Sequence, residues 1–261
     1  MDFQLKNKIA FVSGSTKGIG FAIAKTLAHE GAEVIINGRS QDSIDEALAK
    51  IKEEVPDADV RGVACDFSKK DEVKRLIENV GLVDILVNNV GIFDMKDFLD
   101  IPDEDWQNFY DVNVMSGVRL SRAFLPQMLK QDWGRIIFIS SESAINIPEE
   151  MIHYGMSKTA QLAISRGIAE LTKKTNVTVN CVLPGPTLSD GVKKMAGIKD
   201  EKSKKEAEDE FFNNARPSSI IQRFADPQEV ANMVAYVASP LSSATNGSSL
   251  RVDGGVVKSI Y

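Results

Sequence analysis

Two side chains four residues apart, Tyr154 and Lys158, have the chemistry to supply and accept a proton together. Residues at positions i and i+4 of a helix lie on one face, so the Tyr hydroxyl and the Lys ammonium would be neighbours. A free Tyr has a pKa of about 10 and exchanges protons poorly at neutral pH. A nearby ammonium favours the phenolate and lowers that pKa. The spacing therefore predicts a Tyr–Lys acid–base pair.

A serine cluster precedes this pair. Ser141 lies thirteen residues before Tyr154, just past the apolar run Arg135–Ile139, which we predict to be a strand. Ser140 and Ser143 flank the same strand end, and the choice of Ser141 rests on its spacing to Tyr154. Active sites of open α/β sheets lie at the carboxyl ends of the strands. We therefore expect Ser141 in the site, with Ser143 as a secondary substrate contact.

A glycine-rich turn near the N-terminus is typical of an anion site. It follows an apolar run and precedes a helical pattern, so free N–H groups and the positive end of the helix dipole would face a phosphate. Glycines allow the backbone to approach such a ligand closely. The turn reads Ser13-Gly14-Ser15-Thr16-Lys17-Gly18-Ile19-Gly20.

The end of the second predicted strand bears on which dinucleotide would bind. Sites that prefer NAD usually place an acidic residue there for the ribose 2′-hydroxyl, whereas an Arg accommodates a 2′-phosphate. Residues 37–40 contain Arg39 and no acidic residue, and Lys17 adds a second cation within the glycine turn. Charge matching therefore favours NADP(H), with NAD(H) as the alternative.

The elements that must position these residues alternate along the chain. Segments such as Ile19–Leu27 and Gln161–Leu171 carry apolar residues at helical spacing, and they lie between short, nearly continuous apolar runs typical of strands buried on both faces. This order predicts an α/β fold, a Rossmann-type doubly wound seven-stranded parallel sheet with helices on both faces. The predicted strands are Ile9–Val12, Glu33–Ile36, Val60–Ala64, Val83–Val87, Arg135–Ile139, Val177–Leu183 and Ser249–Val252.

The 261 residues carry no Pro-, Gly- or Ser-rich linker, so we expect a single dinucleotide-binding domain over 1–261. One stretch differs in composition: Lys193–Glu210 has six Lys, six acidic residues and little core material. It is either a solvated surface helix or a mobile lid. Its position directly after a predicted functional loop is the reason to consider 190–216 as a substrate lid or insertion.

Composition excludes several classes of protein. A net charge of −6 disfavours a protein that coats nucleic acid. The two His (His29 and His153) and two Cys (Cys65 and Cys181) leave too few ligands for a metal site rich in these residues and exclude a disulfide framework. We expect no metal, reduced cysteines, and His153 at the surface or in a subunit contact. Without a signal-peptide pattern or an apolar run of membrane length, a cytoplasmic protein is expected.

Taken in order, the motifs resemble those of the short-chain dehydrogenase/reductase family. The resemblance extends from Lys8 to Gly255. The residues that carry it are Gly14/Gly18/Gly20, Asn88-Asn89-Val90-Gly91, Ser141, Tyr154-x3-Lys158, Pro184-Gly185 and the tail from Arg223 to Gly255.

The resemblance implies a role for each catalytic position. Tyr154 would be the general acid of a reduction, and Ser141 would hold the carbonyl oxygen. Lys158 would lower the pKa of Tyr154 and bind the nicotinamide ribose. Asn113 would anchor a water chain to Lys158.

The resemblance also implies two binding sets. The cofactor set is Gly14, Ser15, Thr16, Lys17, Gly18, Ile19, Gly20, Arg39, Asp66, Phe67, Asn88, Gly91, Tyr154, Lys158, Pro184, Gly185, Thr187 and Ser189. The substrate set is Ser141, Ser143, Tyr154 and Pro186.

The activity implied is hydride transfer between NADP(H) and a carbonyl compound or secondary alcohol, with Tyr154 as general acid or base. Reduction of a 3-oxoacyl group on an acyl carrier protein is the alternative, and a non-catalytic NADP-binding regulator is a weaker one. Family resemblance further implies a homo-oligomer, a tetramer or else a dimer, whose partner is a small molecule rather than nucleic acid or membrane.

Overall fold

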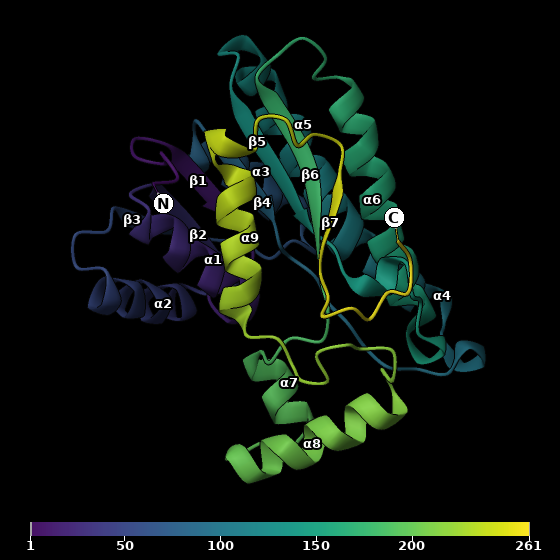
Figure 1. Cartoon of the computed structure of the whole chain (residues 1–261). Helices are drawn as coiled ribbons and strands as arrows, with labels where there is room; N and C mark the ends of the chain where they lie inside the picture. Colours follow the sequence, from purple (N-terminus) through teal and green to yellow (C-terminus); the bar gives the residue numbers. More distant parts are fainter. Residues whose placement is uncertain (1, 261) are drawn as a thin grey trace.

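A computed structural model describes residues 2–260, apart from the side chain of Met195, and contains a seven-stranded parallel sheet (Figure 1). The strand order is β3-β2-β1-β4-β5-β6-β7, so the predicted doubly wound sheet is confirmed. Every strand begins and ends within two residues of its predicted run. The bounds are β1 Ile9–Val12, β2 Glu33–Gly38, β3 Val60–Ala64, β4 Ile85–Asn88, β5 Gly134–Ile139, β6 Val177–Pro184 and β7 Ser249–Val252.

Two apolar layers cover the two faces of the sheet. Successive strand side chains point to opposite faces, so Val12 and Ile85 enter one layer while Phe11 and Leu86 enter the other. The first layer packs against α1 Gly18–His29, α2 Gln41–Glu54 and α9 Pro227–Ala238. The second packs against α3 Lys70–Val80, α5 Met115–Lys130 and α6 Ile152–Glu170. Burial on both faces explains why inner strands such as β1 and β4 are almost wholly apolar. The edge strands β3 and β7 are partly exposed, and each contains an Arg.

Three further helices lie around the carboxyl edge of the sheet. α4 spans Asp103–Phe109, α7 spans Asp190–Met195 and α8 spans Glu201–Asn214. Figure 1 shows α7 and α8 below the sheet, beyond the ends of the strands. Asp200 starts α8 with a capping box, in which its carboxylate accepts from the Ser203 N–H while the Ser203 hydroxyl accepts from the Asp200 N–H.

The residues predicted as a surface helix or lid thus form two helices separated by a turn.

Within residues 2–260, no helix has the length and apolarity needed to cross a membrane. Over the same residues, no three His, Cys, Asp or Glu side chains gather closely enough to hold a metal ion.

Candidate active site

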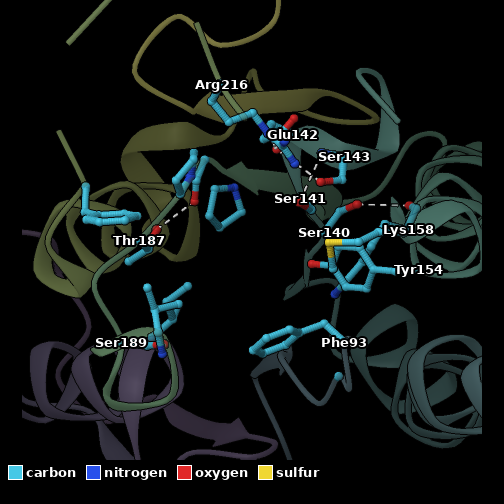
Figure 2. Close-up of a pocket in the computed structure, with 18 of the residues that line it drawn as sticks. Phe93, Ser140, Ser141, Glu142, Ser143, Tyr154, Lys158, Thr187, Ser189 and Arg216 are labelled. Carbon is cyan, nitrogen blue, oxygen red and sulfur yellow. Dashed lines mark hydrogen bonds and ion pairs between the residues drawn. The ribbon is translucent and has the colours of Figure 1, made fainter. Parts of the chain in front are cut away.

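Tyr154, Lys158 and Ser141 line one cavity of about 320 Å³ at the carboxyl edge of the sheet (Figure 2). Ser141 follows β5, and Tyr154 and Lys158 stand one turn apart at the start of α6. The Lys158 Nζ lies 5.7 Å from the centre of the Tyr154 ring and donates to the carbonyl oxygen of Ile139 at 2.9 Å. The structure therefore brings together the three side chains that the sequence predicted as a unit.

Burial controls the protonation of this pair. It raises the pKa of Tyr154 to about 12, against a hydrogen bond with Ser141 that acts to lower it. Desolvation of the phenolate is the largest cause, so the net shift of the Tyr154 pKa is upward, opposite in direction to the lowering expected from the Tyr–Lys spacing. Burial also lowers the pKa of the Lys158 ammonium, to about 8. At neutral pH, Tyr154 holds its proton firmly.

Asn113 lies behind the cavity. It sits in a π-helical turn, Tyr110–Val114, between α4 and α5, and it is fully buried. Its side-chain oxygen accepts from the Ile92 N–H at 2.7 Å, and its Nδ2 donates to the Ser157 hydroxyl at 2.9 Å. Its main-chain oxygen accepts from Gln161 at 2.6 Å. Asn113 therefore ties α6 to the loop after β4.

The glycine turn makes a close junction between β1 and α1. Gly14 and Gly18 have φ angles of +61° and +58°, which favour glycine. At Gly20, an added Cβ would overlap the Asn89 side chain and the Gly14 carbonyl oxygen. Lys17 is the N-cap residue of α1 and makes no side-chain hydrogen bond to the first turn, so no capping side chain occupies its N–H groups.

A second cavity, of about 470 Å³, opens beside this turn. It shares Asn89, Gly91 and Ile92 with the first cavity, so the two form one groove across the carboxyl edge of the sheet. A groove with a helix N-terminus between two hollows fits a dinucleotide. Arg39 and Lys17 lie in the second cavity, where Asp66 is turned toward Ser68, whose N–H and hydroxyl bind its carboxylate at 3.0 and 2.8 Å.

Most predicted site residues line this groove. Those in the second cavity are Gly14, Thr16, Lys17, Arg39, Asp66, Phe67 and Gly91. Those in the first are Ile19, Gly91, Ser141, Ser143, Tyr154, Lys158, Pro184, Gly185, Pro186, Thr187 and Ser189. Figure 2 shows Thr187 and Ser189 across the cavity from Tyr154. Five predicted residues line neither cavity: Ser15, Gly18, Gly20, Asn88 and Asn113.

For two of these five residues, side-chain hydrogen bonds explain why the side chain points into the protein. The Ser15 hydroxyl donates to the Val12 carbonyl at 2.6 Å and accepts from the Asn37 N–H at 2.9 Å. The Asn88 amide donates to the Ser121 hydroxyl at 3.1 Å, beneath the groove. Asn89, the next residue, lines both cavities. Successive side chains at a strand end point to opposite faces, which explains why Asn89 rather than Asn88 lines the groove.

Sequence reasoning missed a charged pair in the cavity wall. Glu142 and Arg216 are 3 % and 8 % exposed, and Arg216 Nε donates to Glu142 Oε1 at 2.9 Å. Burial raises the pKa of Glu142, and Arg216 acts against that shift. The position of Glu142 directly after the predicted Ser141 could have marked it as a site residue. Its partner Arg216 is too distant in the sequence to be paired with it by any local pattern.

The aromatic side chains of the cavity wall were missed as well. Phe93, which follows β4, meets the Tyr154 ring edge-on at 6.5 Å between centroids. Phe211 of α8 packs on Phe224 at 5.2 Å, and both line the cavity. These aromatic side chains come from loops and from the region predicted as a lid, where no strand pattern marks them.

His153 was placed wrongly. It is fully buried rather than at the surface, with its ring 4.1 Å from that of Phe109 and 6.0 Å from that of Trp106. Burial lowers its pKa. The cause is α4, which covers this side of α6 and which sequence reasoning had not predicted.

Comparison with known proteins agrees with this architecture. Residues 14–257 match a family model described as enoyl-(acyl carrier protein) reductase. The chain is 47 % identical to the uncharacterized oxidoreductase YvaG of Bacillus subtilis, with both chains covered completely. It is 34 % identical to dehydrogenase/reductase SDR family member 4 of Bos taurus, covering 96 % of this chain and 88 % of that protein.

A solved structure resembles the fold throughout. L-sorbose reductase from Gluconobacter frateurii, complexed with NADPH and L-sorbose, superposes with a TM-score of 0.91 at 33 % identity, and both chains are covered completely. Together with the full-length relatives and the matched motifs, this likeness covers the sheet, the groove and helices α7 and α8. The chain belongs to the short-chain dehydrogenase/reductase family and is an oxidoreductase of that type.

Proposed function

We propose that this oxidoreductase reduces a small ketone or aldehyde with NADPH, using Tyr154 as the proton donor. The observation that carries the proposal is the convergence of Tyr154, Ser141 and Lys158 on one cavity continuous with a groove of dinucleotide shape. NADPH, when bound, supplies the hydride that reduces the carbonyl carbon. An NADPH complex of the similar L-sorbose reductase supports the choice of cofactor.

The protein's own groups would act on the carbonyl oxygen. Ser141 donates a hydrogen bond to it, and Tyr154 transfers its proton as negative charge develops there. A pKa of about 12 keeps Tyr154 protonated at neutral pH, which suits an acid in reduction. The reverse oxidation would need the phenolate and hence alkaline conditions. The buried Lys158 cation would stabilise the phenolate left after transfer and hold the nicotinamide ribose.

NADPH preference would come from two exposed cations. Lys17 and Arg39 line the second cavity, and β2 ends without a carboxylate that could select a 2′-hydroxyl. Arg39 presents a planar fork suited to a phosphate.

Replacing Arg39 by Ala is expected to raise the Kd for NADPH about 10- to 100-fold, the range for losing a hydrogen bond to a charged group. The Kd for NADH should change far less, because NADH has no 2′-phosphate. Titration of both cofactors by nucleotide fluorescence measures this. Lys50→Ala removes the same charge from an exposed position on α2 outside the cavity. Tighter binding of NADH than NADPH by the wild type would refute the charge argument.

We further propose that residues 190–216 form a substrate lid. Val192 of α7 and Ala207 and Phe211 of α8 line the same cavity as Tyr154. Contacts of Phe211 and Phe212 with Phe224 hold α8 in place. Closing this cover over the reactants would exclude water from the site.

A free small carbonyl compound fits the cavity of Tyr154 better than an acyl group on an acidic carrier protein does. Such a carrier would need a basic docking face, and the lid balances its six Lys of residues 193–210 with six acidic residues. The carboxylates of Glu142 and Glu150 also line the cavity.

The direct test follows NADPH consumption against a panel of ketones, aldehydes and a 3-oxoacyl thioester, with the products identified. We expect alcohol formation from free ketones. Absence of NADPH consumption with every carbonyl compound would refute the proposed function. Preference for the thioester carried by its protein would favour the alternative substrate.

A further inference from the structure

One oxygen atom of the cavity wall lacks a hydrogen-bond donor although it is buried. Glu142 Oε1 accepts from Arg216 Nε at 2.9 Å and from the Ser143 hydroxyl at 3.1 Å. Glu142 Oε2 has no hydrogen-bond partner among the described residues. Glu142 is 3 % exposed and lines the cavity that holds Tyr154 and Ser141. An unpaired buried acceptor is costly, so it marks a place where a ligand's donor would be stabilising.

Arg216 fixes the direction of this carboxylate. It follows α8, and its NH1 donates to the Ala215 carbonyl at 2.8 Å, which restrains the guanidinium. Figure 2 shows Arg216 and Glu142 together at one end of the cavity, next to Ser141 and Ser143. Because the ion pair and the Ser143 hydroxyl both engage Oε1, Oε2 keeps its lone pairs for another donor.

The charges around Oε2 limit what that donor is. Arg216 is already paired with Glu142, and its NH1 lies 3.8 Å from the Glu150 carboxylate. Two carboxylates therefore face one guanidinium, so a substrate carboxylate or phosphate would meet net negative charge. A purely apolar substrate would leave Oε2 unpaired. A neutral hydroxyl, which donates one hydrogen bond, meets both conditions.

The position of Glu142 sets how far that hydroxyl lies from the reacting carbon. Glu142 directly follows Ser141, the residue proposed to hold the carbonyl oxygen, and the charges of Glu142 and Arg216 both act on Tyr154. The hydroxyl and the carbonyl therefore sit close together in the substrate. Phe93, Phe211 and Phe224 line the same cavity and offer apolar surface for a C–H face.

We propose, on the basis of the proposed carbonyl reduction, that Glu142 is a specificity residue that selects neutral polyhydroxy ketones by accepting a hydrogen bond from a hydroxyl near the carbonyl. Arg216 is the positioning residue that holds the carboxylate for this contact. The same arrangement disfavours sugar acids and phosphorylated sugars.

The experiment compares kcat/KM with NADPH for three substrates: a neutral ketohexose, 2-hexanone and a keto sugar acid. The wild type should prefer the ketohexose over both others. In Glu142→Gln, the ratio of kcat/KM for ketohexose to that for 2-hexanone should fall about tenfold, because a charge-assisted hydrogen bond is replaced by a weaker neutral one. Glu149→Gln, which makes the same charge change on an exposed neighbour outside the cavity, should retain the wild-type ratio.

A second variant guards against loss of folding. In Glu142→Leu/Arg216→Met, no unpaired buried charge remains, and the ratio should fall by at least the factor seen in Glu142→Gln. Thermal melting and NADPH binding confirm that each variant is folded.

The outcomes separate the two proposals. If the wild type reduces 2-hexanone but shows no preference for the ketohexose, the specificity role is refuted and carbonyl reduction stands. Equal losses for both substrates in Glu142→Gln would also refute it, since they indicate a merely structural role. If the wild type reduces no carbonyl compound at all, carbonyl reduction itself fails.

Discussion

Replacing Tyr154 by Phe is expected to lower kcat for carbonyl reduction about 10²- to 10⁴-fold, the range for removing a general acid. The substitution deletes one hydroxyl and keeps the ring that packs edge-on against Phe93. The groove would keep its shape, so the Kd for NADPH should stay near the wild-type value. Steady-state kinetics and cofactor titration on the same preparation measure both quantities.

Tyr236→Phe is the matched control, because Tyr236 belongs to α9, does not line the cavity and is 39 % exposed. It should show wild-type kcat. Near-normal reduction by Tyr154→Phe would mean that another group donates the proton. Loss of NADPH binding together with turnover would show instead that the ring supports the groove.

Replacing Arg216 by Met is expected to destabilise the protein by about 3–5 kcal/mol at neutral pH, because it leaves a buried carboxylate without its partner. Glu142 is 3 % exposed, and Arg216 supplies the charge and one of the hydrogen bonds that oppose its desolvation. Urea denaturation, followed by fluorescence, gives the free energy of unfolding.

The loss in free energy of unfolding caused by Arg216→Met should become smaller as the pH falls. Glu142 already has a folded-state pKa above its ordinary value of 4.5, so its ionisation lowers stability as pH rises through that region. Without Arg216, the folded-state pKa of Glu142 rises further, so ionisation of Glu142 lowers the free energy of unfolding by a larger amount. Below about pH 4.5 the carboxyl is protonated in folded and unfolded states alike, and this part of the deficit disappears.

Two controls identify the buried charge as the cause. The double variant Glu142→Gln/Arg216→Met should recover most of the stability, since it removes the ionised group. Arg223→Met breaks an exposed ion pair with Glu229 and should cost less than about 1 kcal/mol. A pH-independent deficit in Arg216→Met would point to lost packing against Phe211 rather than to an unpaired charge.

The sequence predicted the sheet well because its physical signal is local. A strand buried on both faces must be apolar throughout, as β1 is. The bounds of β1 and of the edge strands β3 and β7 match the runs predicted for them. Tyr154 and Lys158 were paired by helical spacing, and Ser141 was placed by the strand end before it. Each of these inferences needs a few neighbouring residues only.

The missed features depend on contacts between distant segments. Arg216 meets Glu142 across 74 residues, and no local pattern pairs them. The burial of His153 depends on α4, whose aromatic residues pack on α6. The raised pKa of Tyr154 arises from desolvation by the whole cavity wall, whereas sequence reasoning considered the nearby ammonium alone.

The proposed function depends on transfer of hydride from NADPH to a carbonyl carbon in the cavity of Tyr154. The most direct measurement uses NADPH that carries deuterium at the transferred position of the nicotinamide ring, together with a small prochiral ketone. We expect an alcohol with deuterium on the carbinol carbon, in one stereochemical configuration, and no alcohol from Tyr154→Phe in the same time. An alcohol without the label, or oxidation of NADPH with the ketone unchanged, would contradict it.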